Sequence, residues 1–324
     1  MCHRRLQTVV LLGSPRSGTT WLQEILGGHD EIASPQETKL LHEYLAPAMR
    51  AWSRQPLDDE EAWRNSRFTG LGAVLTEEQF VEWLRELVAA VEREMTALKP
   101  SARYLLLKDP PDCRHLPLLQ RVLEPTAYIH LIRDGRDVAD SLMRAGRSWG
   151  GGWAPRNALL AARLWRTHVE AAQEAARSAP YLEVRYEALC AEGACTVERV
   201  LEFIGAGASE PVVTHLLDGA RARGDASYGS SALKECLVWS GEVRRRSVAL
   251  REPDGFFGNG GGGWQAWSPL ERALFQWDAG QLLAQLGYRD RPPIGSGLGQ
   301  ERYDRLVAAC VRTARQLAGR VGGV

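Results

Sequence analysis

The sequence lacks an excess of charge of either sign. Its 324 residues contain 40 Lys and Arg against 40 Asp and Glu, so the formal net charge is zero. A chain without a strong positive field is a poor candidate for broad electrostatic binding to nucleic acid or to anionic membranes. We therefore expect neither a nucleic-acid partner nor a membrane partner.

Closely spaced cysteine pairs are also missing. The six cysteines include no Cys-x-x-Cys pair, and the two nearest in sequence are Cys190 and Cys195. This usage favours reduced thiols in a cytosolic protein over a disulfide framework or a zinc site. A chain of this length buries enough surface to fold without such cross-links.

Long hydrophobic runs are absent as well. No window approaches the roughly 18 consecutive apolar residues typical of a membrane-spanning helix. The basic N-terminal segment is followed by the apolar run 8–12, but this run is too short for a secretory signal and no cleavage site precedes Arg16. These features predict a soluble, cytoplasmic protein.

The regular elements that are present alternate between strands and helices. Continuous apolar runs bounded by turn residues predict strands buried on both faces, and amphipathic patterns predict helices between them. This alternation predicts an α/β fold, a three-layer sandwich around a central parallel sheet, formed by one domain over residues 1–324. The predicted strands are 8–12, 104–107, 127–132 and 181–184, and the clearest predicted helices are 76–98, 155–178 and 268–286.

Three segments depart from this alternation. Residues 46–100 contain a helical insertion, a candidate lid over an acceptor site. Residues 219–263 are rich in Gly and Arg and predict a long loop region. Residues 300–324 predict a C-terminal helix.

The most informative motif is GSPRSGTTW at residues 13–21, which lies between a predicted strand and a predicted helix. This arrangement turns backbone N–H groups and the positive end of a helix dipole towards an anion. Gly13 and Gly18 allow close backbone approach, and the following threonines supply hydroxyl donors. Arg16 adds a cation that can bind phosphate oxygens in bidentate fashion. The motif therefore predicts a phosphate-binding loop.

The loop differs from that of nucleotide triphosphatases at a key position. The Walker pattern requires Lys directly after its second Gly, whereas Thr19 follows Gly18 here and the cation is Arg16. No strand ending in a lone Asp for magnesium is evident in the sequence. We therefore expect a phosphate site that uses no metal.

Two motifs together resemble those of sulfotransferases that use 3′-phosphoadenosine 5′-phosphosulfate (PAPS). GSPRSGTTW resembles their 5′-phosphosulfate loop, and AYIHLIRDGRDVADSL at 127–142 resembles the strand and helix that bind the 3′-phosphate. With the downstream SPQET, the resemblance extends to tyrosylprotein sulfotransferases and bacterial relatives and covers roughly residues 8–205. It implies the sulfotransferase fold, which is similar to that of P-loop NTPases.

The resemblance also implies residue roles. Glu37 matches the family's catalytic base, and Lys108 matches the lysine that, with Arg16, stabilises charge in the transition state. An aromatic residue after the loop packs on adenine in the cytosolic family members. The implied nucleotide-binding residues are Arg16, Ser17, Gly18, Thr19, Thr20, Trp21, Arg133, Ser141 and Tyr186.

Alternatives remain open around this assignment. Glu37 is instead a helix-start carboxylate in one interpretation, and His42 or His115 is then the base. Trp149 and Trp153 either line the acceptor pocket or pack in the core. The family usually shows a basic residue beside a Gly-Trp segment near the C-terminus, where this sequence has Gly260–Gly263 before Trp264.

The predicted function is transfer of the sulfuryl group of PAPS to a hydroxyl, which leaves adenosine 3′,5′-bisphosphate. The acceptor is expected to be a small molecule such as a secondary metabolite or a sugar, and the 11 Trp residues favour an apolar or aromatic one. A monomer or a homodimer is expected. The alternatives are a P-loop phosphotransferase and an inactive nucleotide-binding scaffold.

Overall fold

A five-stranded parallel sheet forms the centre of the molecule. The computed structural model describes residues 5–54, 70–148, 150, 152–225 and 261–288, together with residues 302, 305 and 309. The strand order is β2-β3-β1-β4-β5, and each paired strand runs parallel to its neighbour. The strands are β1 (Gln7–Leu12), β2 (Ile32–Ala33), β3 (Tyr104–Leu107), β4 (Ala127–Ile132) and β5 (Tyr181–Arg185). The predicted α/β class with a central parallel sheet is confirmed.

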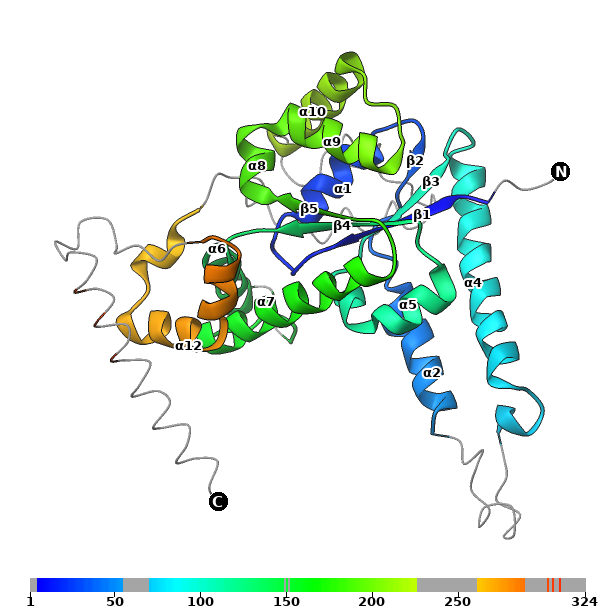
Figure 1. Ribbon diagram of the computed structural model, residues 1–324, viewed down its shortest axis with the longest axis horizontal. Helices are drawn as coiled ribbons and strands as arrows, with labels where there is room; N and C mark the ends of the chain where they lie inside the picture. Colours follow the sequence, from blue (N-terminus) through cyan, green and yellow to red (C-terminus); the bar gives the residue numbers. More distant parts are fainter. Residues whose placement is uncertain are drawn as a thin grey trace, which may run out of the picture.

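Helices cover both faces of this sheet (Figure 1). Along β1, Val10 and Leu12 pack into one apolar cluster, whereas Val9 and Leu11 pack into another on the opposite face. The first cluster includes α4 (Glu77–Leu98) and α5 (Leu116–Leu123). The second includes α1 (Thr19–Gly27), α8 (Tyr186–Ala191), α9 (Gly193–Ile204) and α10 (Glu210–Asp225). Burial on both faces explains why the strands read as continuous apolar runs.

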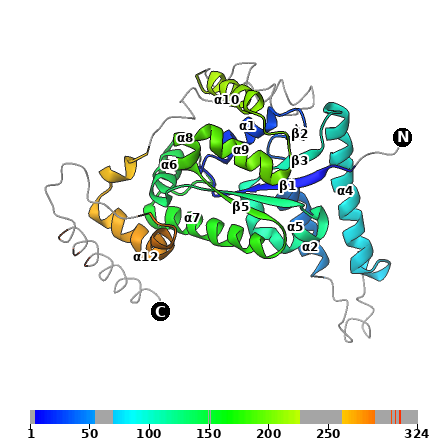
Figure 2. The same ribbon diagram turned by 45° about the horizontal axis from the view of Figure 1, so that its top comes forward.

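A third apolar cluster lies at one end of the molecule, where Figures 1 and 2 show α6 and α12 beside α7. It joins α6 (Gly135–Arg147), α7 (Ala158–Gln173), α12 (Pro269–Gln285) and the short helix η7 (Gly263–Ala266). Its large side chains include Trp165, Trp267 and Phe275. The cluster fixes α6, the helix that carries the second phosphate motif.

Side-chain caps account for several helix starts. Thr76 forms a capping box with Gln79 at α4, and Ser268 caps α12 through Glu271. The predicted start of α7 at residue 155 is wrong, because the Asn157 side chain accepts a hydrogen bond from the Leu160 N–H and the helix begins at Ala158.

The three atypical segments are described in part. Between 46 and 100 the structure contains α2 (Ala46–Trp52), a short helix η2 (Leu71–Ala73) and α4, while residues 55–69 lie outside the described residues. Helix α10 extends into the predicted loop region 219–263 as far as Asp225, and 226–260 lie outside the described residues. The predicted helix at 300–324 also lies outside them, apart from three positions.

Among the described residues, no helix combines the length and the apolar character needed to cross a bilayer. The cytoplasmic location and the lid role of 46–100 stay predictions.

Candidate functional site

The candidate site lies at the carboxyl-terminal edge of the sheet. The chain leaves β1 into the phosphate loop, β2 towards Glu37, β3 at Lys108, β4 at Arg133 and β5 at Tyr186. Strand β1 pairs with both β3 and β4, so the chain reverses direction across the sheet beside this loop. Open parallel sheets bind ligands at this kind of position. The topology therefore gathers residues that are more than 150 positions apart in the sequence.

The loop at 13–18 is shaped to receive an anion. Gly18 has a φ of +97° and precedes α1, whose N-terminus has no side-chain cap and no acidic residue in its first turn. A Cβ at Gly13 would lie 2.8 Å from the Leu131 carbonyl oxygen, so only glycine leaves this backbone close to β4. The hydroxyl of Ser17 donates within the loop, to Ser14 O at 2.7 Å. Uncapped N–H groups at a helix start fit a phosphate.

The two phosphate motifs meet each other directly. Nε of Arg16 donates to Oγ of Ser141 at 3.0 Å, and Nη1 of Arg133 lies 3.5 Å from the carbonyl oxygen of Arg16. The sequence assigns Arg16 to the 5′ end of the nucleotide and the other two to its 3′-phosphate, without predicting that they touch. Their proximity gives one continuous, positively charged region beside the loop.

Aromatic rings lie next to this region. The Arg133 guanidinium lies 4.2 Å from the centroid of the Tyr186 ring, in cation–π contact. Tyr186 meets Trp21 edge to face, with ring centroids 5.8 Å apart. Burial raises the pKa of Tyr186 to about 12, so its hydroxyl remains neutral. The two rings supply flat apolar surface beside the phosphate loop, as a purine base requires.

The residue after Tyr186 connects two parts of this site. Glu187 accepts a hydrogen bond from the Asp134 N–H at 2.8 Å through one oxygen and from the Tyr288 hydroxyl at 2.9 Å through the other. Glu187 therefore fixes the backbone directly after Arg133 and links this backbone to Tyr288, which follows α12. Sequence reasoning missed this contact, because the partners lie more than 50 and 100 positions away.

The glycine-rich segment near the C-terminus packs on α6. Asp137 accepts a hydrogen bond from the Gly262 N–H at 2.6 Å, and the Arg136 guanidinium lies 4.1 Å from the ring centroid of Trp264. The family usually has a basic residue at this place. In this chain, the glycine segment 261–263 instead contacts the acidic side chain of Asp137. The glycine segment that departs from the family pattern therefore lies beside the second phosphate motif.

Glu37 and Lys108 form an ion pair at the ends of β2 and β3. The Lys108 ammonium contacts Glu37 Oε1 and also donates to the Thr20 hydroxyl at 3.1 Å. The Lys108 side chain is only 2% exposed, whereas that of Glu37 is 40% exposed. A buried ammonium therefore faces a carboxylate that solvent and a ligand can reach.

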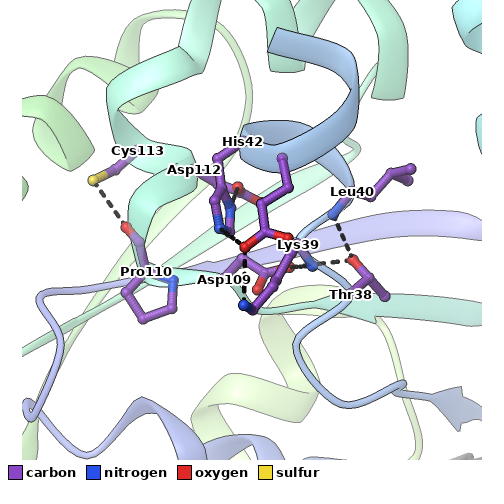
Figure 3. A network of polar contacts seen from close by, with 9 residues as sticks. Thr38, Lys39, Leu40, His42, Asp109, Pro110, Asp112 and Cys113 are labelled. Atoms are coloured by element: carbon purple, nitrogen blue, oxygen red, sulfur yellow. Dashed lines mark hydrogen bonds and ion pairs between the residues drawn. The ribbon is translucent and has the colours of Figure 1, made fainter. Parts of the chain in front are cut away.

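A second polar network lies directly beside this ion pair (Figure 3). Asp109 accepts hydrogen bonds from the Lys39 N–H at 2.9 Å and from the Thr38 hydroxyl at 3.2 Å. Asp112 faces His42, with Oδ1 and Nδ1 3.3 Å apart. Burial raises the pKa of Asp109 to about 7, with further contributions from the charges of Asp112 and Glu37. The sequence analysis singled out neither aspartate, although Asp109 directly follows Lys108.

His42 and His115, the alternative candidates for the base, have different surroundings from Glu37. The hydrogen bond between His42 and Asp112 raises the pKa of His42. Burial lowers the pKa of His115. Glu37 does not start a helix, because the next helix, η1, begins at Leu40. Among the described residues, Lys108 pairs with Glu37, whereas His42 pairs with Asp112. The geometry thus favours Glu37 over the histidines.

Two further expectations concern aromatic residues and metals. Trp153 is 46% exposed, which is more than core packing requires, and Trp149 lies outside the described residues. Within the described part of the chain, no group of three or more His, Cys, Asp or Glu side chains is arranged to hold a metal ion. The absence of a metal requirement stays a prediction.

Comparisons with known proteins agree with this site. A model of the sulfotransferase family matches residues 8–210, more than half of the chain. A putative protein-tyrosine sulfotransferase of Caenorhabditis briggsae is 24% identical over 236 residues, covering 71% of this chain and 78% of that protein. Human protein-tyrosine sulfotransferase 1 is 26% identical over 141 residues, 44% of this chain and 35% of its own length. The match therefore spans about a third of this human relative.

Solved sulfotransferase structures share the fold. The sulfotransferase domain of the Synechococcus PCC 7002 olefin synthase has a TM-score of 0.52 at 22% identity, over 90% of this chain and 98% of that domain. Mouse sulfotransferase SULT7A1, complexed with PAP, has a TM-score of 0.52 at 12% identity, over 86% of this chain and 88% of its own. The predicted sulfotransferase fold is confirmed, and the chain belongs to the sulfotransferase family.

Proposed function

We propose that this enzyme transfers the sulfuryl group of PAPS to a hydroxyl of a small-molecule acceptor, with Glu37 as the general base. The observation that carries the proposal is the position of Lys108. Its buried ammonium contacts the exposed carboxylate of Glu37 on one side and the loop residue Thr20 on the other. One cation thereby links the expected acceptor side to the expected donor side.

The residues around the loop fit the nucleotide. Backbone N–H groups at the start of α1, with Ser17, Gly18, Thr19 and Thr20, would hold the 5′-phosphosulfate. Arg133 and Ser141 would hold the 3′-phosphate, close to Arg16. Trp21 and Tyr186 would pack on the adenine. These assignments follow the family motifs and are supported by the proximity of the side chains.

When bound, PAPS supplies an activated sulfuryl group and adenosine 3′,5′-bisphosphate as its leaving group. Glu37 then accepts the proton of the acceptor hydroxyl as the new oxygen–sulfur bond forms, a role worth roughly 10²–10⁴ in rate. Lys108 and Arg16 offset the negative charge that develops on the donor side. Attack and departure occur on opposite sides of sulfur in an in-line displacement.

The acceptor class is the least constrained part of the proposal. The relatives named above are protein-tyrosine sulfotransferases, whose names point to a tyrosine hydroxyl, whereas the tryptophan content of this chain favours a small aromatic or apolar molecule. We propose the small molecule and treat a tyrosine peptide as the alternative. A monomer or a homodimer stays the expected assembly.

The test follows label from radiolabelled PAPS into a panel of phenols, alcohols, sugars and tyrosine peptides. The Glu37→Gln variant should lose roughly 100-fold or more in turnover, because it keeps the shape of the side chain but cannot take the proton. Its affinity for adenosine 3′,5′-bisphosphate, measured by calorimetry, should remain unchanged. Near-normal turnover would move the base to His42 or His115, whose Ala variants would then decide.

Two further arms separate the competing functions. Labelled ATP with magnesium tests the phosphotransferase alternative, and EDTA should leave sulfuryl transfer intact because Arg16 and Lys108 supply the positive charge. A strict magnesium requirement with transfer from ATP would overturn the proposal. Nucleotide binding without transfer to any acceptor would support the inactive scaffold.

A further inference from the structure

The mechanism above gives no role to Asp109, a buried carboxylate beside the site. Asp109 is 3% exposed and follows Lys108 directly in the chain. Its Oδ2 accepts from the Lys39 N–H at 2.9 Å and from the Thr38 hydroxyl at 3.2 Å. Its Oδ1 is buried without a hydrogen-bond partner among the described residues. Burying a carboxylate with one oxygen unsatisfied costs free energy, so a buried Asp at this position needs a structural or functional reason.

The segment that Asp109 holds is the one that carries Glu37. Residues 37–39 belong to no helix or strand, although the Lys39 carbonyl oxygen accepts a hydrogen bond from the Glu43 N–H at 2.9 Å at the start of the next helix. Lys39 has a φ of +54°, a left-handed conformation that is unfavourable for a residue with a side chain. It directly precedes η1 (Leu40–Leu45), a π-helix, a rare form that is frequent at functional sites. The contacts from Asp109 stabilise this turn.

Two consecutive residues hold this segment at two points. Lys108 directly follows β3. The next residue, Asp109, has an extended backbone with φ −137° and ψ 111°. Successive side chains on an extended backbone point to opposite sides. Lys108 therefore contacts the Glu37 carboxylate. Asp109 contacts the Thr38 hydroxyl and the Lys39 backbone, as Figure 3 shows.

We propose that Asp109 is a positioning residue that directs the Glu37 carboxylate towards the acceptor by holding the Thr38–Lys39 turn. The inference rests on the proposed role of Glu37 and adds to it. Without these two hydrogen bonds the turn is held less firmly in its left-handed conformation, and the direction of the Glu37 side chain is less well fixed. Such a loss affects turnover more than nucleotide binding, because the phosphate loop lies on β1.

The charge state of Asp109 gives this role a measurable signature. Its charged neighbours are Glu37, Lys39 and His42 on one side, and Lys108 and Asp112 on its own segment. Burial raises the pKa of Asp109 to about 7, so its carboxyl group gains or loses a proton within the pH range in which activity is measured. A proton on Oδ2 would compete with the two donors, and a proton on Oδ1 would have no acceptor among the described residues. The ionised form therefore holds the turn better, and activity should rise with pH through about 7.

The test compares five variants of the chain with the wild type, one of which is His42→Gln. Asp109→Ala removes both hydrogen bonds. Thr38→Val removes one of them, together with the hydrogen bond from the Leu40 N–H to the Thr38 hydroxyl at 3.3 Å. Asp109→Asn keeps an oxygen acceptor for the turn but cannot titrate. Asp112→Asn is the matched control, because it changes a carboxylate that is similarly buried but faces His42 instead of the turn. Each is measured for kcat and KM across pH 5.5–9, for affinity towards adenosine 3′,5′-bisphosphate, and for thermal stability.

Asp109→Ala should lower kcat at least tenfold with less than a twofold change in nucleotide affinity, and Thr38→Val should lower kcat less. Asp109→Asn should retain more activity than the alanine variant and should lose the rise in kcat/KM near pH 7. Asp112→Asn should lower kcat by less than Asp109→Ala does. A His42→Gln variant should keep the rise in kcat/KM near pH 7, which assigns that rise to Asp109.

The inference is overturned if Asp109→Ala keeps wild-type kcat, or if Asp109→Asn keeps the wild-type pH profile. If the alanine variant fails to fold, the asparagine variant and Thr38→Val decide by the same criteria. The proposed function has its own control, Glu37→Gln. If that variant remains active, the assignment of the base fails, whereas an inactive Glu37→Gln beside a fully active Asp109→Ala refutes only the positioning role.

Discussion

Substitution of Gly18 tests whether the phosphate loop depends on its contact with Tyr186. Gly18 has a φ of +97°, and a Cβ built there lies 2.5 Å from Cδ2 of the Tyr186 ring. That ring cannot move freely, because the Arg133 guanidinium lies 4.2 Å from its centroid and Trp21 meets it edge to face. Gly18→Ala therefore adds both backbone strain and an overlap inside the expected nucleotide site.

The chain offers a control that separates these two effects. Gly152 has a φ of +98°, and a Cβ built there meets no heavy atom within 4 Å among the described residues beyond its chain neighbours. Gly152→Ala should thus cost only the backbone strain, about 1–2 kcal/mol of unfolding free energy. Gly18→Ala should cost the same strain plus about 1–3 kcal/mol for forcing a methyl group against a packed ring.

Urea unfolding and calorimetric titration with adenosine 3′,5′-bisphosphate measure the two consequences. Gly18→Ala should be the less stable variant and should bind the nucleotide more than tenfold more weakly, since displacing Tyr186 also displaces Arg133. Gly152→Ala should bind as the wild type does. Equal stability losses in the two variants, with nucleotide affinity intact in both, would refute the predicted overlap and the link between Tyr186 and the phosphate site.

Two further predictions concern the nucleotide and the core. Arg133→Ala should abolish the preference for adenosine 3′,5′-bisphosphate over adenosine 5′-phosphate in calorimetric titrations, and a preserved preference would contradict its assignment to the 3′-phosphate. Acid should destabilise the fold, because burial lowers the pKa of His130 to about 3 and of His168 to about 4, while both imidazoles take up protons near 6.5 when unfolded. Urea unfolding should show stability falling as the pH drops from about 6.5 towards 4, and a wild-type slope in the His130→Gln variant would show that this histidine does not contribute.

The sheet was predictable where a strand is long enough to show a pattern. The four predicted strands lie within one residue of their observed ends, because each is a continuous apolar run between turn residues. Strand β2 was missed, since Ile32–Ala33 is too short to show periodicity and pairs only at the edge of the sheet. The start of α7 was misplaced because Asn157 is a stronger cap than the proline that precedes it by two residues.

The site was predictable only where local motifs carry it. The phosphate loop and the pair Arg133 and Ser141 stand on strand–helix junctions, which sequence patterns identify well. Contacts between distant segments carry no such signal. The hydrogen bond from Arg16 to Ser141 spans 125 positions, and that from Lys39 to Asp109 spans 70. The sheet order brings these residues together, because β1 lies beside β4, which leads to Ser141, and β2 lies beside β3, which leads to Asp109.

The chemistry of the ammonium group explains why a lysine is suited to the end of β3. An ammonium has three donors, and Lys108 directs one to Glu37 and one to Thr20. In the proposed mechanism, the third donor serves the departing nucleotide, where negative charge builds. Because the side chain is 2% exposed, water does not compete strongly for these donors. In the proposed mechanism, the same cation that pairs with Glu37 thus offsets the negative charge that forms on the departing nucleotide.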